Sequence, residues 1–282
     1  MKDGVGPVLP SPISTPAEMS RLKTRAQVDV PRDLGYVFDA IRLCRHSLQG
    51  VVPLIGFCGA PFTLMCYMVE GGGAKSYTHA RKWLYMHPEA SHSLLALITS
   101  VLVEYLVCQV QAGAQVLEVF DTWSGELSAE AFKQFCLPYV MQVAREVKKQ
   151  CKERGLVVPP MTLFPKGADY AVSWVAAASS DATQGYDLIS LDWSTSASQA
   201  RKDVTSSGAR VGLQGNLDPA VLYCSESQIR QATRDMLDAF GPGGNLVANL
   251  GHGMLPDHPL EGLRVFVDEV HKYSPQVINR KQ

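Results

Sequence analysis

Polar and aromatic side chains gather in short stretches that each follow an apolar run of strand length. In one stretch, FDTWSG (residues 120–125), Asp121 and Thr122 come directly after such a run. In another, NLGHG (residues 249–253), His252 lies between two glycines, and the flexible backbone on both sides allows the imidazole to approach a ligand closely. Asp121 is interpreted either as a general base or as a hydrogen-bond partner of a neighbouring loop. Groups of these types hold ligands and move protons.

A helix is expected to begin after the first apolar run, and it carries two hydroxyl groups, Thr63 and Tyr67, four residues apart. Tyr67 has the chemistry to donate a hydrogen bond to a carboxylate, although an ordinary half-buried tyrosine shows the same pattern. The glycines at 71–73 either present backbone N–H groups to an anion or simply end the helix. Lys166, after another run, is placed either to pair with an acidic substrate or to face solvent.

Other chemistries find no support in the sequence. No GxSxG stretch supplies a hydrolase serine, and no GxGxxG follows the first strand-like run. His252 and His258 lie on one loop, but no further histidine or cysteine close by completes a zinc site. The seven cysteines include no CxxC pair, which argues against structural zinc and against a disulfide framework. We therefore expect no metal and a reducing, cytoplasmic location.

The elements that position these residues are short apolar runs that alternate with longer helical stretches. Helical spacing is clearest between Pro88 and Gly113, where an apolar stripe is expected to pack in the core. Strands and helices in alternation predict parallel βαβ units, whose ligand sites lie at the carboxyl ends of the strands. The strand-like runs are residues 51–57, 114–120, 160–164, 187–193, 209–215 and 245–251.

Composition and charge restrict the class of partner. The chain has 282 residues, of which 46% are hydrophobic and 19% charged, as is typical of a globular protein. A net charge of −1 provides no overall field for nucleic acid or an anionic membrane. The richest apolar stretch, residues 94–107, is interrupted by polar side chains. We therefore expect a small-molecule ligand, no nucleic acid and no membrane.

The six units supply most of a (β/α)8 TIM-type barrel, which needs eight strands. Residues 1–33 are expected to be extended or irregular and residues 34–48 to form one helix, so the beginning of the chain does not supply the two further units. The sequence predicts a single α/β barrel domain over residues 1–282 with about six of the eight βα units. An open, doubly wound sheet is the structural alternative.

Several stretches taken together resemble the uroporphyrinogen decarboxylase family. The similarity extends from residues 34–41 to residues 266–274, with the motifs in the family's order. The resemblance implies a (β/α)8 barrel and a cytosolic homodimer. It also implies removal of carbon dioxide from the four acetate side chains of uroporphyrinogen III to give coproporphyrinogen III, with no metal or organic cofactor. The stretches are YMVEGGG, RKWLY, FDTWSG, LDW, LQGNLDP and NLGHG.

The same resemblance implies which residues contact substrate. Tyr67 and His252 match the family's substrate-contacting tyrosine and histidine, and Thr122 stands where serine is usual and keeps the hydroxyl. Protonation of a pyrrole carbon makes the substrate its own electron sink for the departing carboxylate. The protein then supplies an acid, fixed partners for the carboxylates and a negative group near the cationic ring.

The resemblance is incomplete towards the N-terminus. The family's RQAGRY-type motif, with its substrate-binding arginines, and its FSDI-type motif, with the principal catalytic aspartate, have no match here. The chain is therefore interpreted as N-terminally truncated, and its catalytic acid stays unassigned. Two alternatives remain open. One is an inactive paralogue that dimerises with a complete enzyme, and the other is a related corrinoid-dependent methyltransferase, against which the absence of a His-x-Cys cluster counts.

Overall fold

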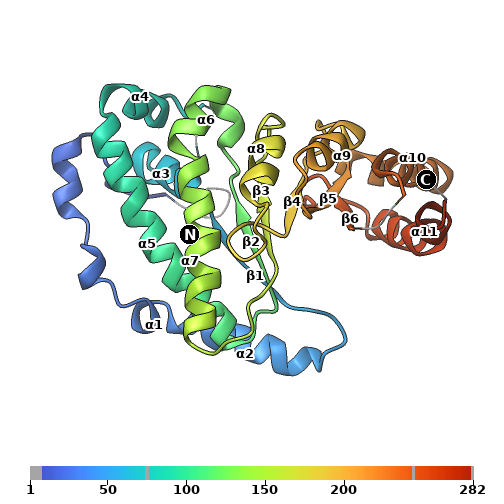
Figure 1. Cartoon of the computed structure of the whole chain (residues 1–282), viewed down its shortest axis with the longest axis horizontal. Helices are drawn as coiled ribbons and strands as arrows, with labels where there is room; N and C mark the ends of the chain where they lie inside the picture. The colour runs from blue at the N-terminus through green and yellow to red at the C-terminus, as the bar shows by residue number, and fades with distance from the viewer. Residues whose placement is uncertain (1–7, 74–75, 243–244, 281–282) are drawn as a thin grey trace.

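A parallel sheet forms the centre of the protein. The computed structural model describes residues 8–73, 76–242 and 245–280. Within them one six-stranded sheet runs in the order β1-β2-β3-β4-β5-β6, so that each strand pairs with its neighbours in the chain (Figure 1). The strands are β1 (Ile55–Gly59), β2 (Val116–Phe120), β3 (Met161–Phe164), β4 (Leu188–Ser190), β5 (Gly212–Leu217) and β6 (Leu246–Leu250).

The helices begin and end at residues whose chemistry is visible in the sequence. Ser128 accepts a hydrogen bond from the Ala131 amide at the start of α6, and Ser225 forms a capping box at the start of α10. α5 ends at Gly113, whose φ of 116° lies in the left-handed region. The helices are α1 (Val30–Asp33), α2 (Gly35–Leu48), α3 (Pro61–Glu70), α4 (Thr78–Met86), α5 (Pro88–Ala112), α6 (Ala129–Phe135), α7 (Leu137–Glu153), α8 (Ala171–Ala178), α9 (Ala197–Ser206), α10 (Glu226–Phe240) and α11 (Leu260–Ile278).

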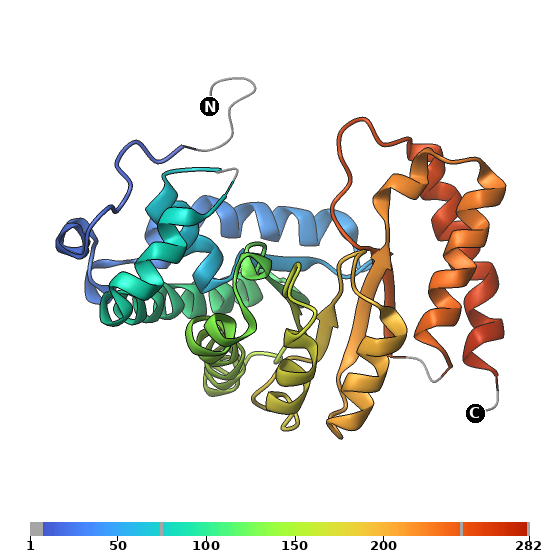
Figure 2. The ribbon, with the colours of Figure 1, turned by 90° about the horizontal axis from the view of Figure 1, so that it is seen from above.

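The sequential strand order selects the barrel prediction over the doubly wound alternative. A doubly wound sheet reverses its direction of growth, so its strand order is not sequential. When every crossover has the same hand and the same direction, every helix falls on the same face of the sheet. Figures 1 and 2 show α5, α7, α8, α9 and α10 following one another along one side of the curved sheet. The predicted six βα units are therefore confirmed in the described part of the chain.

Two boundaries differ from what the sequence pattern predicts. β1 begins at Ile55 rather than Val51, because the chain leaves α2 through a left-handed turn at Gln49 and Gly50 and bends again at residues 51–52. The capping residue Ser128 and the basic run before Gly155 predict one continuous helix, but the structure divides it into α6 and α7 near Cys136. Pro138, two residues after Cys136, has no backbone N–H and cannot donate the hydrogen bond that would continue the first helix.

The N-terminal segment is more helical than the predicted extended or irregular course of residues 1–33. The structure describes this segment from residue 8 onward, and short 3-10 turns occupy Pro16–Arg21 and Arg25–Gln27 before α1. Asp29 caps α1 by accepting a hydrogen bond from the Arg32 amide. Local capping of this kind forms turns without adding a strand to the sheet.

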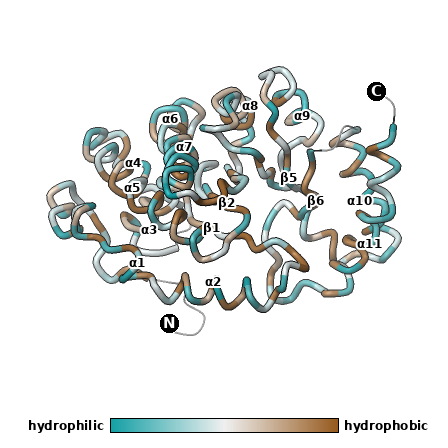
Figure 3. The backbone as a smooth tube through the Cα atoms, turned by 60° about the horizontal axis from the view of Figure 1, so that its bottom comes forward, coloured by the Kyte–Doolittle hydropathy of each residue, from teal (hydrophilic) through white to brown (hydrophobic). Residues whose placement is uncertain are grey.

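The main core lies between the sheet and its helices. Side chains that point outward from the strands, such as Leu117, Leu163 and Leu213, are completely buried against the helices. α5 is long and apolar enough by composition to cross a membrane, yet 56% of its most apolar window is buried inside the protein. It packs against α3, α7 and β1, as a core helix does. In Figure 3 the strands β1 and β2 are largely brown, whereas α2 alternates between teal and brown.

The two end strands of the sheet are open on their outer edges. Within the described residues no strand pairs with the free edge of β1 or of β6. Three apolar side chains on these strands are consequently exposed, Ile55 by 48%, Phe57 by 60% and Val247 by 45%. Strands in parallel sheets are normally covered on both faces, so these positions are the least protected part of the sheet.

Candidate functional site

Side chains that follow five of the six strands meet near the carboxyl ends of those strands, four of them in loops and one, Tyr67, on helix α3. In a barrel-type sheet all these ends lie on one rim, which is where ligands bind. Five side chains along this rim contact one another in chain order, and we call them the rim array. They are Tyr67 after β1, Trp123 after β2, Lys166 after β3, Trp193 after β4 and His252 after β6.

Ring and cation contacts make the rim array continuous. The Tyr67 and Trp123 ring centroids lie 6.3 Å apart in an edge-to-face arrangement. The Lys166 ammonium lies 5.8 Å from the Trp123 ring centroid and 5.9 Å from that of Trp193. Trp193 in turn meets the His252 ring edge-on at 5.7 Å. Two of the sequence-predicted site residues, Tyr67 and His252, therefore stand at opposite ends of one series of contacts.

α3 places Tyr67 because its ends are well defined. Pro61 is suited to the first turn of a helix, and Gly71, with φ of 81°, ends α3 in the left-handed region. One turn before Tyr67, the Thr63 hydroxyl donates to Asp121 Oδ1 at 3.0 Å. The Trp123 amide also points to the Thr63 oxygen, at 3.4 Å. These hydrogen bonds connect α3 to the loop after β2 and so fix Tyr67 relative to that loop.

Asp121 supports this connection and does not face an open cleft. Its side chain is completely buried, and Oδ2 has no hydrogen-bond partner among the described residues. Burial raises the pKa of Asp121 to about 7, although the hydrogen bond from Thr63 acts to lower it. Of the two interpretations of Asp121, the structure favours the hydrogen-bond partner over the general base, but the group it binds is Thr63 on helix α3 and not a neighbouring loop.

The titratable groups around Asp121 are themselves uncharged near neutral pH. Cys66 on α3 and Cys136 between α6 and α7 have pKa values raised by burial, as do Tyr170 and Tyr186. None of these groups offers a positive charge that would hold Asp121 ionised. The end of β2 is therefore anchored by a carboxyl group in a dry, neutral environment.

Thr122, the third predicted site residue, is half-buried between Asp121 and Trp123. Its hydroxyl makes no hydrogen bond within the described part of the chain, so it remains free to accept or donate towards a ligand. The structure places Thr122 in the same loop as Trp123 and therefore beside the Tyr67 end of the rim array.

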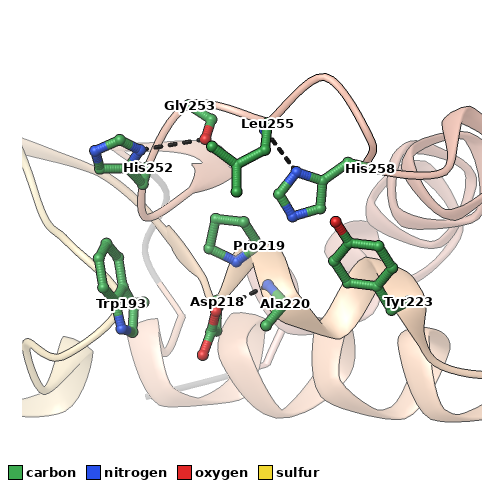
Figure 4. Close-up of a pocket in the computed structure, with 9 residues that line it drawn as sticks. All are labelled: Trp193, Asp218, Pro219, Ala220, Tyr223, His252, Gly253, Leu255 and His258. Atoms are coloured by element: carbon green, nitrogen blue, oxygen red, sulfur yellow. Dashed lines mark hydrogen bonds between the residues drawn. The ribbon is translucent and has the colours of Figure 1, made fainter. Parts of the chain in front are cut away.

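His252 lies in a different environment, at the mouth of a pocket of about 260 Å³. The imidazole is exposed, and its Nδ1 is 3.2 Å from the Gly253 carbonyl oxygen. Figure 4 shows Trp193 and His252 on one side of this pocket and Tyr223 and His258 on the other. The nine lining residues are Trp193, Asp218, Pro219, Ala220, Tyr223, His252, Gly253, Leu255 and His258.

The far wall of this pocket is fixed by its own hydrogen bonds. The Leu255 amide donates to His258 Nδ1 at 2.6 Å, so this nitrogen is the unprotonated acceptor of the ring. The Tyr223 hydroxyl donates to Asp257 at 2.8 Å and its ring packs on His258. His258 thus shapes the wall of the pocket, whereas the sequence suggested only that it is no metal ligand.

A polar cluster on the inner face of the sheet was not identified from the sequence. The Gln214 amide nitrogen donates to Glu118 Oε1 at 3.0 Å and to the Ser190 hydroxyl at 3.2 Å. Burial raises the pKa of Glu118 to about 7. The sequence does contain a sign of this cluster. In the strand VLEVF, Glu118 interrupts an apolar run and lies between the outward-facing Leu117 and Val119, so its side chain must point to the inner face.

Asp192, at the end of β4, is another carboxylate that sequence analysis missed, within the LDW stretch. Burial acts to raise its pKa, but hydrogen bonds from Ser194, Gly167 and Thr195 outweigh burial, so the pKa of Asp192 is lowered. Asp192 is therefore ionised and already bound by these donors. Among the described residues no group of three or more His, Cys, Asp or Glu side chains is placed to hold a metal ion.

A sequential parallel sheet and a ligand rim at the carboxyl ends of its strands define a (β/α)-barrel enzyme. A family model described as uroporphyrinogen decarboxylase (URO-D) matches residues 1–273. The chain belongs to the uroporphyrinogen decarboxylase family.

Curated relatives support this membership over nearly the whole chain. The uroporphyrinogen decarboxylase of Salinibacter ruber is 51% identical over 274 residues, which cover 97% of this chain and 72% of that protein. The Dictyostelium discoideum protein of the same name is 46% identical over 280 residues, covering 99% and 73% respectively. The human protein is 47% identical over 274 residues, covering 97% and 71%.

Solved structures agree on the fold alone. A methyltransferase from Methanosarcina mazei has a TM-score of 0.69 and 21% identity, with 89% of this chain and 69% of that chain covered. A B12-independent methionine synthase from Shewanella sp. has a TM-score of 0.58 and 12% identity, with 85% and 67% covered. The sequence comparisons favour the decarboxylase family over the methyltransferase alternative, since the methyltransferase resemblance is confined to the shape of the backbone.

Proposed function

We propose that this protein removes carbon dioxide from the acetate side chains of uroporphyrinogen III and releases coproporphyrinogen III. The observation that carries the proposal is the identity of 46–51% with uroporphyrinogen decarboxylases over 97–99% of the chain. The rim array adds support, because it brings together hydroxyl, imidazole and ammonium groups on the face of the barrel where ligands bind.

Tyr67, Thr122 and His252 are proposed to contact the substrate. Hydrogen bonds of Thr63 join α3, which carries Tyr67, to the loop after β2, which carries Thr122. The hydroxyl groups of Tyr67 and Thr122 suit hydrogen bonds to carboxylates. His252 is exposed at the opposite end of the rim array, where its imidazole is accessible to a ligand. The chemistry needs no cofactor, since the protonated pyrrole accepts the electrons of the departing carboxylate. The catalytic acid itself stays unassigned.

A cytoplasmic homodimer is proposed as the working form of the protein. Free cysteines, five of them buried, suit a reducing compartment. Exposed apolar side chains on α11, Leu260 and Val267, suit a contact with a second copy. Light scattering coupled to size-exclusion chromatography tests the dimer directly, and a mass of one chain at every concentration contradicts it.

The test of the activity is anaerobic incubation with uroporphyrinogen III, followed by oxidation and chromatographic separation of the porphyrins. We expect coproporphyrin to accumulate, and Tyr67→Phe to slow its formation about tenfold to a hundredfold through loss of one hydrogen bond. Tyr85→Phe is the matched control, since Tyr85 is exposed on α4 and lies outside the rim array. Binding of uroporphyrin without any turnover favours the inactive paralogue instead.

A further inference from the structure

Lys166 is held by an unusually complete set of backbone contacts for a lysine in a loop. Its carbonyl oxygen accepts hydrogen bonds from the Gly125 amide at 3.0 Å and from the Ser124 hydroxyl at 3.2 Å. The next residue, Gly167, donates its amide to Asp192. The loop after β3 is therefore fastened on one side to the loop after β2 and on the other to the end of β4.

Close packing of two glycines makes this position rigid. A Cβ atom added to Gly125 would lie 2.8 Å from Gly167 Cα, so the two loops approach as closely as backbone allows. Gly167 has φ of 72°, in the left-handed region. The Lys166 backbone is thus fixed, and only its side chain is left to adjust.

The Lys166 side chain lies against aromatic surfaces and has no anionic partner. Its ammonium is within 6 Å of the Trp123 and Trp193 ring centroids, and Lys166 takes part in none of the ion pairs among the described residues. Asp192 is already bound by the Gly167 amide and by Ser194, and Asp121 is completely buried with one carboxyl oxygen bound by Thr63. Aromatic faces attract a cation and exclude part of its water, but they do not neutralise its charge.

We propose that Lys166 binds a carboxylate of the substrate, with the Trp123 and Trp193 indoles forming the walls of this subsite. The inference rests on the proposed function, whose substrate carries a carboxylate on every side chain. Lys166 occupies the middle of the rim array, between Tyr67 and His252, so a ligand that reaches both ends passes over its ammonium. A charge-assisted hydrogen bond to a substrate carboxylate would supply the anionic partner that the Lys166 ammonium lacks.

The carboxylate bound by Lys166 is one that the reaction retains. An ammonium paired with the departing carboxylate would stabilise its charge in the ground state and oppose its conversion to neutral carbon dioxide. A pair with a propionate carboxylate is present in both the ground state and the transition state, and it therefore contributes to binding alone. Loss of the ammonium consequently raises KM and leaves kcat largely unchanged.

The experiment measures quenching of tryptophan fluorescence by uroporphyrin III, the stable oxidised form, since Trp123 and Trp193 report directly on the subsite. Lys166→Met keeps the apolar stem of the side chain and removes the charge. We expect Lys166→Met to weaken binding about tenfold to a hundredfold and to reduce its dependence on salt, whereas Lys166→Arg binds within a few-fold of the parent. Lys202→Met, an exposed lysine on α9, is the matched control.

The uncharged octamethyl ester of uroporphyrin separates charge from packing. We expect the ester to bind equally to the parent protein and to Lys166→Met. Equal affinity of both proteins for uroporphyrin, or an equal loss of affinity for uroporphyrin and its ester, overturns the proposal while leaving the proposed function intact. Failure of the parent protein itself to bind uroporphyrin overturns the proposed function, and the Lys166 subsite with it. Unchanged circular dichroism of Lys166→Met, or the same result with Lys166→Gln, excludes misfolding as the cause.

Discussion

The two ends of the rim array are built differently. At the β1–β2 end, Tyr67 and Thr122 belong to elements joined by the buried hydrogen bond between Thr63 and Asp121. At the β6 end, His252 is exposed and flanked by glycines, and its contacts within the described residues are the Trp193 ring and a 3.2 Å approach to the Gly253 carbonyl oxygen. One end therefore presents its hydroxyl groups in a fixed geometry, whereas the other adjusts to the ligand and loses freedom when it binds.

The first prediction concerns Gly251, where the His252 end packs closely against the loop after β4. A Cβ atom at Gly251 would press against the backbone of Trp193 and of Asp192, well inside van der Waals contact. Gly251→Ala is therefore expected to lower the free energy of unfolding by about 4 kcal/mol and to displace Trp193 and His252. Urea denaturation and the porphyrin assay measure both effects. Gly253→Ala is the matched control, because open space surrounds that residue; equal losses in the two variants would contradict the prediction.

The second prediction concerns pH and the fixed end. Burial raises the pKa of Asp121 to about 7 from an ordinary value of 3.8, so between these values the folded protein holds a proton that the unfolded chain releases. Stability is therefore greatest below this window and falls as pH rises towards 7, by about 1.4 kcal/mol per pH unit. Asp121→Asn removes this contribution.

Denaturant titrations at pH 5, 6 and 7 test this sign. The difference in unfolding free energy between Asp121→Asn and the parent should shift in favour of the variant by roughly 2–3 kcal/mol from pH 5 to pH 7. Glu118, whose pKa is also raised to about 7 by burial, leaves a similar slope in both proteins and cancels in the difference. A difference that is constant across this range would show that Asp121 is ionised throughout.

A smaller loss of stability is expected when the hydrogen bond between Thr63 and Asp121 is removed. Thr63→Val removes the hydroxyl that donates to Asp121 Oδ1 and leaves both carboxyl oxygens without a protein donor. The expected cost is about 1–2 kcal/mol in the free energy of unfolding, together with slower turnover because Tyr67 loses its fixed position. Thr63→Ser keeps the hydroxyl and should retain most of both quantities. Thermal unfolding and steady-state kinetics of Thr63→Val and Thr63→Ser measure both effects, and equal losses in the two variants would contradict the prediction.

The smallest effect on stability is expected at the adjustable end. His252→Ala should change the free energy of unfolding by no more than about 0.5 kcal/mol, because the imidazole is exposed and makes few contacts. Its kcat/KM for uroporphyrinogen should nevertheless fall at least about tenfold, through loss of a substrate contact. A large loss of stability in this variant would remove the contrast between the two ends of the rim array.

Much of the fold was predictable because it depends on local patterns. The six strand-like runs and the helix that begins at Pro88 and ends at Gly113 follow from periodicity and helix-end chemistry. The break of the helix after Ser128 was missed, although Pro138 marks it. Sequential strand order could not be read directly, since it depends on which strands pair across the sheet.

The site was less predictable, because side-chain direction depends on strand register. Asp121 and Glu118 both read as polar residues near the end of one strand, yet Glu118 points to the inner face and Asp121 to the helices. Tyr67, Thr122 and His252 were chosen by motif, and the proposal that they contact substrate remains a prediction. The position of Lys166 between two indoles arises from loops that are distant in sequence, so no local pattern reveals it.

Neighbouring loops of the rim touch through glycines, and this contact limits how the protein can change over evolution. Gly125 packs on Gly167, and Gly251 packs on Trp193. A larger residue or an insertion at one of these points displaces the adjacent loop as well as its own. Substrate preference in this protein is therefore expected to diversify by exchange of whole side chains on fixed loops, as at Thr122, and not by independent changes in loop length.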